Sequence, residues 1–239
     1  MQRIDGTGPK PGVVCVLGMH RSGTSCVTGT LQAAGVFLGE VSVHNKHNVK
    51  GNRENGVVMS LHNDLLAANG GRWDRPPAVV RWSDEHRQRR DAIIADLAAS
   101  AACWGFKDPR TLLTLDGWLD VLPAPRFVGV VRHPQAVARS LHTRGGMPLD
   151  HAVSLWTEYN RRLAAYRERF GFPVICFDRP MPELIGALRK LCVSLGLDAS
   201  AAESFFDADL RHHDGGSESW DDVPAAAREL YERLESAAF

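Results

Sequence analysis

The sequence predicts an α/β protein in which helices flank both faces of a parallel sheet. Short apolar segments rich in β-branched residues alternate along the chain with longer segments of helical periodicity. Parallel strands need a crossover connection, which a helix usually provides, so this alternation favours a parallel sheet. With 239 residues, 44% of them hydrophobic, the chain is long enough for one sizeable core. We expect a single domain over residues 1–239, with a flexible tail at residues 1–11.

Four short apolar segments predict the strands of this sheet. The first, residues 13–17, is rich in valine and ends before Gly18, and its length and flanks favour a buried strand over a helix. The other three predicted strands are residues 102–106, 126–131 and 173–177.

Helices are predicted between these strands, where apolar residues recur three and four positions apart. Asn52 is expected to cap one helix and Ser83 another, because both side chains can accept a hydrogen bond from a free backbone amide. Gly35 and Gly171 are expected to end two of the helices. The predicted helices are residues 24–34, 53–69, 84–100, 134–142, 149–170 and 182–195, with one more near the C-terminus.

Composition and charge argue against several classes of protein. The 28 basic and 28 acidic side chains give a net charge of zero, which argues against bulk nucleic-acid binding. The chain has no run of 18 apolar residues, so no membrane span is expected, and its polar N-terminus is unlike a secretory signal. The five cysteines are odd in number and lack C-x-x-C spacing, so we expect reduced thiols in a cytoplasmic protein.

A phosphate-binding loop is predicted at residues 18–25, whose sequence is GMHRSGTS. Gly18 and Gly23 have the G-x4-G spacing of a P-loop and stand between the first predicted strand and the next helix, the context that this motif requires. Successive backbone N–H groups of such a loop form a concave anion site, which the positive end of the helix reinforces. The alternative is an ordinary glycine-rich turn.

The loop departs from the pattern of nucleotide hydrolases in two ways. Thr24 occupies the position where those enzymes have lysine, and the cation comes earlier, at Arg21. The strand at residues 126–131 is followed by Arg132, where a hydrolase would have an acid that holds Mg²⁺. Asp108 follows another predicted strand, but a lysine and a proline flank it. This combination indicates phosphate chemistry without a metal.

The loop resembles the 5′-phosphosulfate loop of the sulfotransferases, which use 3′-phosphoadenosine-5′-phosphosulfate (PAPS). In that family a second element has a strand, then arginine, and serine eight residues later on the next helix, a spacing that Arg132 and Ser140 match. The resemblance implies that these two residues bind the 3′-phosphate, the arginine with charged donors and the serine with its hydroxyl. It also implies a 5′-side set of six loop residues: His20, Arg21, Ser22, Gly23, Thr24 and Ser25.

Two further residues resemble functional elements of sulfotransferases. Lys107 begins a Lys-Asp-Pro element similar to that of the tyrosylprotein type, which implies contact with the sulfuryl group or the bridging oxygen; the alternative is a solvated loop lysine. Glu54 stands where several glycan- and tyrosine-directed members have an acidic general base, although the helix dipole alone favours glutamate in a first helical turn. His20 and His133 compete for the role of base, because imidazole titrates near neutrality.

The remaining histidines do not predict a metal site. His44, His47 and His62 lack a further ligand at zinc-binding spacing, so loop and surface positions are favoured for them. His212 and His213 belong either to a lid over the nucleotide or to a linker.

Other residues leave two interpretations open. Arg110 either forms a structural ion pair with Asp108 or contacts a ligand. Four aromatic residues either line an acceptor pocket or pack in the core, which is the commoner fate: Trp73, Trp82, Trp156 and Tyr159.

The resemblance implies a PAPS-dependent sulfotransferase with a P-loop α/β fold, in which Arg21, Glu54 and Lys107 are catalytic and adenosine 3′,5′-bisphosphate is released. The acceptor would supply a hydroxyl or an amine, and it can be a sugar, a lipid, a phenol or a peptide. The oligomeric state stays open. Two other functions are an atypical P-loop kinase, which needs ATP, Mg²⁺ and an acidic metal ligand, and a non-catalytic nucleotide-binding protein.

Overall fold

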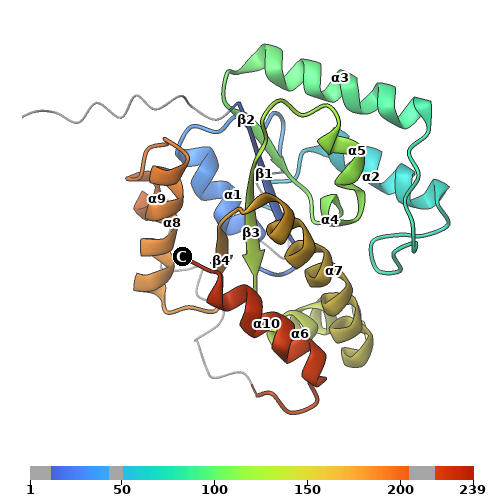
Figure 1. Ribbon diagram of the computed structural model, residues 1–239, viewed down its shortest axis with the longest axis vertical. Helices are drawn as coiled ribbons and strands as arrows, with labels where there is room; N and C mark the ends of the chain where they lie inside the picture. Colours follow the sequence, from blue (N-terminus) through green and yellow to red (C-terminus); the bar gives the residue numbers. More distant parts are fainter. Residues whose placement is uncertain (1–11, 43–50, 205–218) are drawn as a thin grey trace, which may run out of the picture.

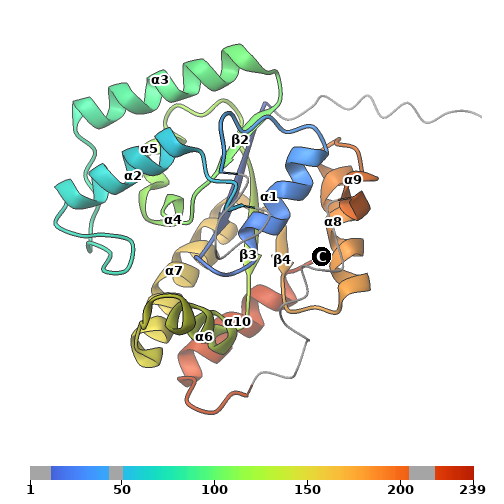
Figure 2. The same cartoon turned by 180° about the vertical axis from the view of Figure 1, so that it is seen from behind.

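The computed structural model describes residues 12–42, 51–204 and 219–239, so the tail predicted at residues 1–11 lies outside the described part. Its sheet has four parallel strands in the order β2-β1-β3-β4. Figure 1 and Figure 2 show helices on both faces of this sheet, which confirms the predicted fold class. The strands are β1 (Val13–Gly18), β2 (Trp104–Lys107), β3 (Arg126–Val131) and β4 (Val174–Cys176).

Alternate residues of β1 belong to two separate buried clusters, one on each face of the sheet. Val14 and Val16 pack with aliphatic side chains of the helices on one face. Cys15 and Leu17 point to the opposite face, as the two-residue period of a strand requires. Burial of apolar surface on both faces is therefore what holds the layers together. The helices over the first face are α1 (Thr24–Ala33), α8 (Met181–Ser194) and α9 (Ala201–Ser204).

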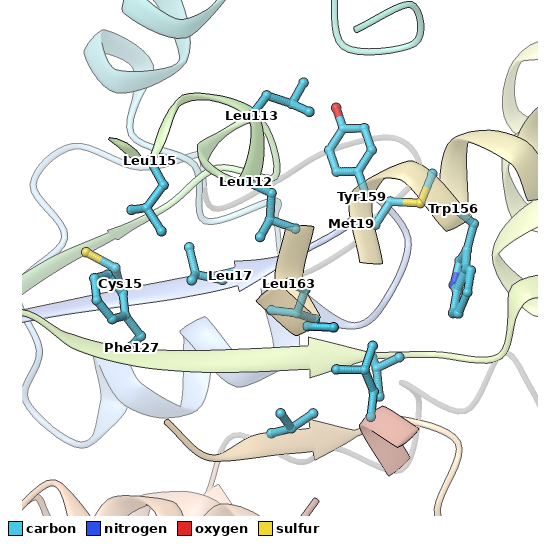
Figure 3. Packing of buried hydrophobic residues seen from close by; sticks show 14 of the residues in the cluster. Cys15, Leu17, Met19, Leu112, Leu113, Leu115, Phe127, Trp156, Tyr159 and Leu163 are labelled. Carbon is cyan, nitrogen blue, oxygen red and sulfur yellow. The ribbon is translucent and has the colours of Figure 1, made fainter. Parts of the chain in front are cut away.

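Two of the aromatic residues pack in the buried cluster on the second face of the sheet. Figure 3 shows Leu17 next to Leu112 and Leu163, with Trp156 and Tyr159 farther along the same cluster. Trp156 and Tyr159 are fully buried, so of the two interpretations the structure favours core packing. The helices over this face are α2 (Gly56–Ala68), α4 (Thr111–Thr114), α7 (Leu149–Phe170) and α10 (Ala225–Ser236).

The outer helix α3 (Asp84–Ser100) runs beside α2, and it also contacts strand β2. Its predicted cap is confirmed, because Oγ of Ser83 accepts a hydrogen bond from the backbone N–H of His86. Helix α6 (Pro134–Gly145) follows β3 and extends beyond its predicted end. The four-residue helices α4 and α5 (Asp116–Leu119) were not predicted, because periodicity has no signal over so few residues.

The predicted start of α2 is wrong. The helix begins at Gly56, and its N-cap is Asn55, whose Oδ1 accepts from the backbone N–H of Val57 over 3.1 Å. An antiparallel bridge between Val41 and Asn55 holds the preceding chain out of the helix. Glu54 therefore does not lie in a first helical turn, and the helix dipole gives no explanation of its position.

The second strand is displaced along the chain from its predicted position at residues 102–106, because β2 includes Lys107. This residue pairs with Val16 in the parallel ladder, so it ends β2 rather than opening a loop. Its side chain is 1% exposed, which contradicts the alternative of a solvated lysine.

All five cysteines are free thiols, and four of them are buried: Cys15, Cys103, Cys176 and Cys192. In the described part of the chain, none of the helices combines the length and the apolar character that crossing a membrane requires.

Candidate functional site

The predicted loop lies where the order of the strands reverses. Strand β1 stands between β2 and β3, so the chain moves to one side of β1 and then to the other. In open α/β sheets, the crevice at the carboxyl ends of the strands beside such a reversal binds ligands. The loop follows β1 at this edge, Lys107 ends β2 and Arg132 follows β3. The fold thus brings three sequence-predicted elements to one edge.

The loop has the backbone conformation of an anion-binding nest. Arg21 and Gly23 have φ angles of 66° and 87°, in the left-handed region. Turns of this kind point successive N–H groups into one concavity. A Cβ atom at position 23 would lie 2.2 Å from the ring of Phe177, so only glycine fits there. Arg21 is not glycine, and such local strain is found mostly at functional sites.

Two buried polar atoms of loop side chains have no hydrogen-bond partner among the described residues. They are the hydroxyl of Ser22 and Nε2 of His20. An unsatisfied buried polar group costs about 1–3 kcal/mol. The hydroxyl and the loop amides together fit a ligand that accepts hydrogen bonds, such as a phosphate or sulfate ester.

Both residues of the second predicted element contact the loop through Arg21. Nε of Arg21 donates to the hydroxyl of Ser140 over 2.8 Å. Nη1 of Arg132 donates to the backbone carbonyl of Arg21 over 3.2 Å. Two motifs far apart in the sequence therefore meet at one point.

Positive charge accumulates around this contact. Burial lowers the pKa of Arg21, and the nearby charges of Arg144 and Arg132 lower it further. Burial also lowers the pKa of Arg132, which the charge of Asp178 opposes and that of Arg139 reinforces. Like charges gathered in a partly buried place repel each other unless an anion neutralises them. The electrostatics therefore favour a ligand with several negative charges.

Lys107 and Glu54 form an ion pair on the other side of the loop. Nζ of Lys107 lies 2.9 Å from Oε1 of Glu54 and 3.4 Å from the hydroxyl of Ser25. That hydroxyl donates to the backbone carbonyl of Asn52 over 3.0 Å. Burial lowers the pKa of Lys107, and the carboxylate of Glu54 opposes the shift. A cation and an acid thus stand together at the start of α1.

The two histidines considered as bases are both neutral at pH 7. Burial lowers the pKa of His20 to about 3, and the charge of Arg110 contributes to the shift. Burial and the charges of Arg139 and Arg132 lower the pKa of His133 to about 4. Unlike an unperturbed imidazole, neither ring therefore titrates near neutrality.

His62 is fully buried on α2, so the expectation of a surface position is wrong. Its Nε2 accepts from the indole N–H of Trp118 over 2.9 Å, which assigns the ring proton to Nδ1 because indole is only a donor. Nδ1 lies 3.7 Å from Oδ2 of Asp108. His62 follows Val58 by one helical turn, and this spacing could have predicted its burial.

Arg110 forms the ion pair that was one of its two predicted roles. Its Nη1 donates to both carboxylate oxygens of Asp108, over 3.0 and 3.2 Å. Burial alone would raise the pKa of Asp108, but the Nδ1–H of His62, which faces the carboxylate, and the charge of Arg110 hold it below its usual range. The carboxylate is therefore ionised and fully engaged.

The two remaining aromatic candidates lie in different surroundings. The ring of Trp73 packs 4.4 Å from that of His20, and its backbone carbonyl accepts from the hydroxyl of Tyr159 over 2.8 Å. The ring of Trp82 packs instead against Trp118, at 6.0 Å between centroids. Of these two candidates, Trp73 is thus the one that touches the loop.

Four histidines fall outside the described residues, namely His44, His47, His212 and His213. Within the ranges that the structure describes, no group of three or more histidine, cysteine and acidic side chains is placed to hold a metal ion.

A sequence profile of the sulfotransferase family matches residues 11–201, which is most of the chain. The chain belongs to the sulfotransferase family. No curated protein matches its sequence.

Solved structures agree with this assignment at the level of the fold. This sulfotransferase is similar to the sulfotransferase domain of the olefin synthase of Synechococcus PCC 7002, with 17% identity, a TM-score of 0.59 and 96% of each chain covered. It is also similar to a sulfotransferase of Alicyclobacillus acidocaldarius, with 16% identity, a TM-score of 0.55 and 95% of each chain covered.

Two charged residues of this sulfotransferase were missed by sequence reasoning. Arg144 follows Ser140 by one turn of α6, and this spacing could have placed it near the loop. Asp178 follows β4, and its Oδ2 accepts from the backbone N–H of His133 over 2.6 Å. Ligands bind at the carboxyl ends of the strands in open α/β sheets, so its position directly after a predicted strand could have identified it.

Proposed function

We propose that this sulfotransferase transfers the sulfuryl group of PAPS to a hydroxyl or amine of an acceptor and releases adenosine 3′,5′-bisphosphate. The observation that carries the proposal is the contact of Arg21 with both Ser140 and Arg132. PAPS carries phosphate at both its 5′ and its 3′ positions. A protein that binds it needs two phosphate sites held at a fixed separation.

The two phosphate-bearing ends of PAPS would bind to different elements of the site. The loop amides, with the side chains of residues 20–25, would bind the 5′-phosphosulfate. Arg132 and Ser140 would bind the 3′-phosphate, for which a guanidinium supplies charge-assisted donors. The hydroxyl of Ser22, which has no hydrogen-bond partner in the described part of the chain, supports this assignment.

The chemical step requires neutralisation of the leaving phosphate. The acceptor oxygen or nitrogen attacks sulfur, the bond from sulfur to the bridging oxygen breaks, and its electron pair stays on the phosphate of the departing bisphosphate. We propose that Lys107 and Arg21 stabilise the negative charge that develops on this phosphate. Each well-aimed donor of this kind contributes about 2.7–4 kcal/mol in other enzymes.

We propose that Glu54 is the general base that removes the proton from the acceptor group. Its carboxylate lies 2.9 Å from Nζ of Lys107, so the acid stands beside the cation that would face the leaving group. Its side chain is 13% exposed, which leaves it accessible to an acceptor. A positioned base typically contributes about 10²–10⁴-fold to the rate.

A kinase is disfavoured by the contacts of the acids that follow β2 and β4. A Mg²⁺-dependent phosphoryl transfer needs a carboxylate available to the metal. Asp108 is engaged by Arg110. Asp178 accepts from His133 and from the hydroxyl of Tyr231. Both carboxylates already have donors.

The proposal is tested by incubating the protein with PAPS and a panel of sugar, lipid, phenol and peptide acceptors, and by measuring released bisphosphate. We expect acceptor-dependent release that Lys107→Met abolishes and that Lys190→Ala, on the exposed side of α8, leaves unchanged. The melting temperature of each variant shows whether it is folded. Release that continues unchanged in folded Lys107→Met would contradict the assignment.

A further inference from the structure

The C-terminal segment, residues 219–239, packs against the start of α6. The ring of Trp220 lies 4.2 Å from that of His133, and the amide of Gln135 donates to the backbone carbonyl of Asp221 over 2.7 Å. Figure 1 and Figure 2 both show α10 beside α6 at this end of the molecule. The segment lies beyond residues 11–201, which match the family, so these contacts involve a part of the chain outside that match.

Asp178 connects this segment to Arg132. Its Oδ2 accepts two hydrogen bonds, from the backbone N–H of His133 over 2.6 Å and from the hydroxyl of Tyr231 over 3.0 Å. Its Oδ1 lies 3.8 Å from Nε of Arg132. With two donors on one oxygen, the carboxylate cannot turn freely, and its other oxygen stays directed to the guanidinium.

Helix α10 is itself anchored to the edge strand. Tyr231 and Leu234 are buried in the core cluster on that face. Beyond the helix, Ala238 bridges Val174 of β4, and the backbone N–H of Phe239 donates to the carbonyl of Val174 over 3.2 Å. The hydroxyl of Tyr231 is therefore held in place by packing on one side and by backbone pairing on the other.

We propose that Tyr231 and Asp178 are positioning residues for Arg132, and that the C-terminal segment thereby sets the preference for a nucleotide with a 3′-phosphate. The inference rests on the proposed function, since it takes Arg132 as the 3′-phosphate residue. Nη1 of Arg132 donates to the carbonyl of Arg21, and Asp178 faces Nε on another edge of the guanidinium. Loss of the Tyr231 hydroxyl frees Asp178 to turn, and the guanidinium then loses one of the contacts that hold it.

The effect should be confined to the 3′ side. The backbone of the loop binds the 5′ side, and the described contacts of Tyr231 are with Asp178, Cys176 and the aromatic rings of Trp220 and His133. We therefore expect AMP, which lacks a 3′-phosphate, to bind nearly as well when Tyr231 is altered. A role in stability alone would weaken both nucleotides or neither.

The test compares the dissociation constants of adenosine 3′,5′-bisphosphate and AMP, measured by calorimetry on the full chain. Tyr231→Phe keeps the ring that packs on His133 and Trp220 and removes only the hydroxyl. We expect it to weaken bisphosphate binding about 2- to 10-fold, the range of one hydrogen bond, and AMP binding less than about twofold. Asp178→Asn should reduce the preference at least as much. Tyr166→Phe, on α7, is the matched control and should leave both constants unchanged.

Two outcomes would overturn the proposal. One is an unchanged ratio of the two constants in both Tyr231→Phe and Asp178→Asn, and the other is an equal weakening of both nucleotides. A wild-type protein that binds the bisphosphate no better than AMP would instead contradict the proposed function on which the inference rests.

Discussion

Arg21 and Ser140 are 119 positions apart in the sequence, yet Nε of Arg21 lies 2.8 Å from the hydroxyl of Ser140. The contact ties the loop after β1 to helix α6. Arg132 precedes the same helix and donates to the backbone carbonyl of Arg21, so the two elements proposed to bind phosphate hold one another in position. Substitutions in the two elements should therefore have different effects on nucleotides with and without a 3′-phosphate.

Arg132→Ala should remove the preference for adenosine 3′,5′-bisphosphate over AMP. Charged hydrogen bonds contribute about 1.5–3 kcal/mol each, so we expect a loss of about tenfold or more in bisphosphate affinity, with AMP little affected. Arg126→Ala, at the opposite end of β3, is the matched control. An unchanged preference in a folded Arg132→Ala protein would remove Arg132 from the 3′ site.

Arg21→Ala should weaken both nucleotides, because its position in the loop assigns it to the 5′ side that they share. We expect about tenfold or more for each, by the same charged hydrogen bonds. Competitive displacement of a fluorescent nucleotide measures both constants in one experiment. If AMP binding is retained while bisphosphate binding is lost, Arg21 belongs to the 3′ side alone.

Glu54→Gln should lower kcat by at least about a hundredfold if Glu54 is the general base, with bisphosphate binding nearly unchanged. The variant also loses the ion pair with Lys107, so its melting temperature is expected to fall. Glu85→Gln, at an exposed site in the first turn of α3, is the control for removal of a carboxylate. Full activity of folded Glu54→Gln would mean that the acceptor loses its proton elsewhere.

His20 should make the stability of the fold depend on pH. Its pKa is about 3 in the folded protein and about 6.5 in the unfolded chain, so between these values only the unfolded chain binds the proton. The free energy of unfolding therefore falls as the pH drops below about 6.5, by up to about 1.4 kcal/mol for each pH unit. His20→Gln removes this contribution.

The measurement is urea unfolding of wild type and His20→Gln between about pH 7 and pH 4.5, a window in which most carboxylates stay ionised. The variant should show the shallower dependence, and His142→Gln, at an exposed site on α6, serves as the control. Parallel curves for wild type and His20→Gln would contradict the burial of a neutral ring.

Helices and strands were predicted correctly from the sequence where a few neighbouring residues mark their ends. The strand at residues 126–131 and the helix at 149–170 were found at the observed bounds, because an apolar run marks the first and Gly171 ends the second. The start of α2 was predicted wrongly because asparagine is a good cap at either position 52 or position 55. The bridge between Val41 and Asn55 decides which of the two residues caps the helix.

The residues of the candidate site could be singled out from the sequence, whereas the contacts among them could not. The loop, Arg132, Ser140, Lys107 and Glu54 were all singled out from the sequence. Their sequence spacing could not reveal that Lys107 is buried against an acid 53 positions earlier, or that Arg21 joins the two elements. Such contacts depend on the order of the strands, which a single sequence does not state.

We propose that the site binds a nucleotide with both 5′ and 3′ phosphates and that this binding needs no metal. Thermal denaturation with adenosine 3′,5′-bisphosphate in EDTA, with AMP in EDTA, and with Mg·ATP tests it most directly. Binding to the folded state stabilises it by about 2.7 kcal/mol at a hundredfold excess over Kd. We predict the largest increase in melting temperature with the bisphosphate in EDTA. A larger increase with Mg·ATP would contradict metal-free binding of the bisphosphate and favour a kinase.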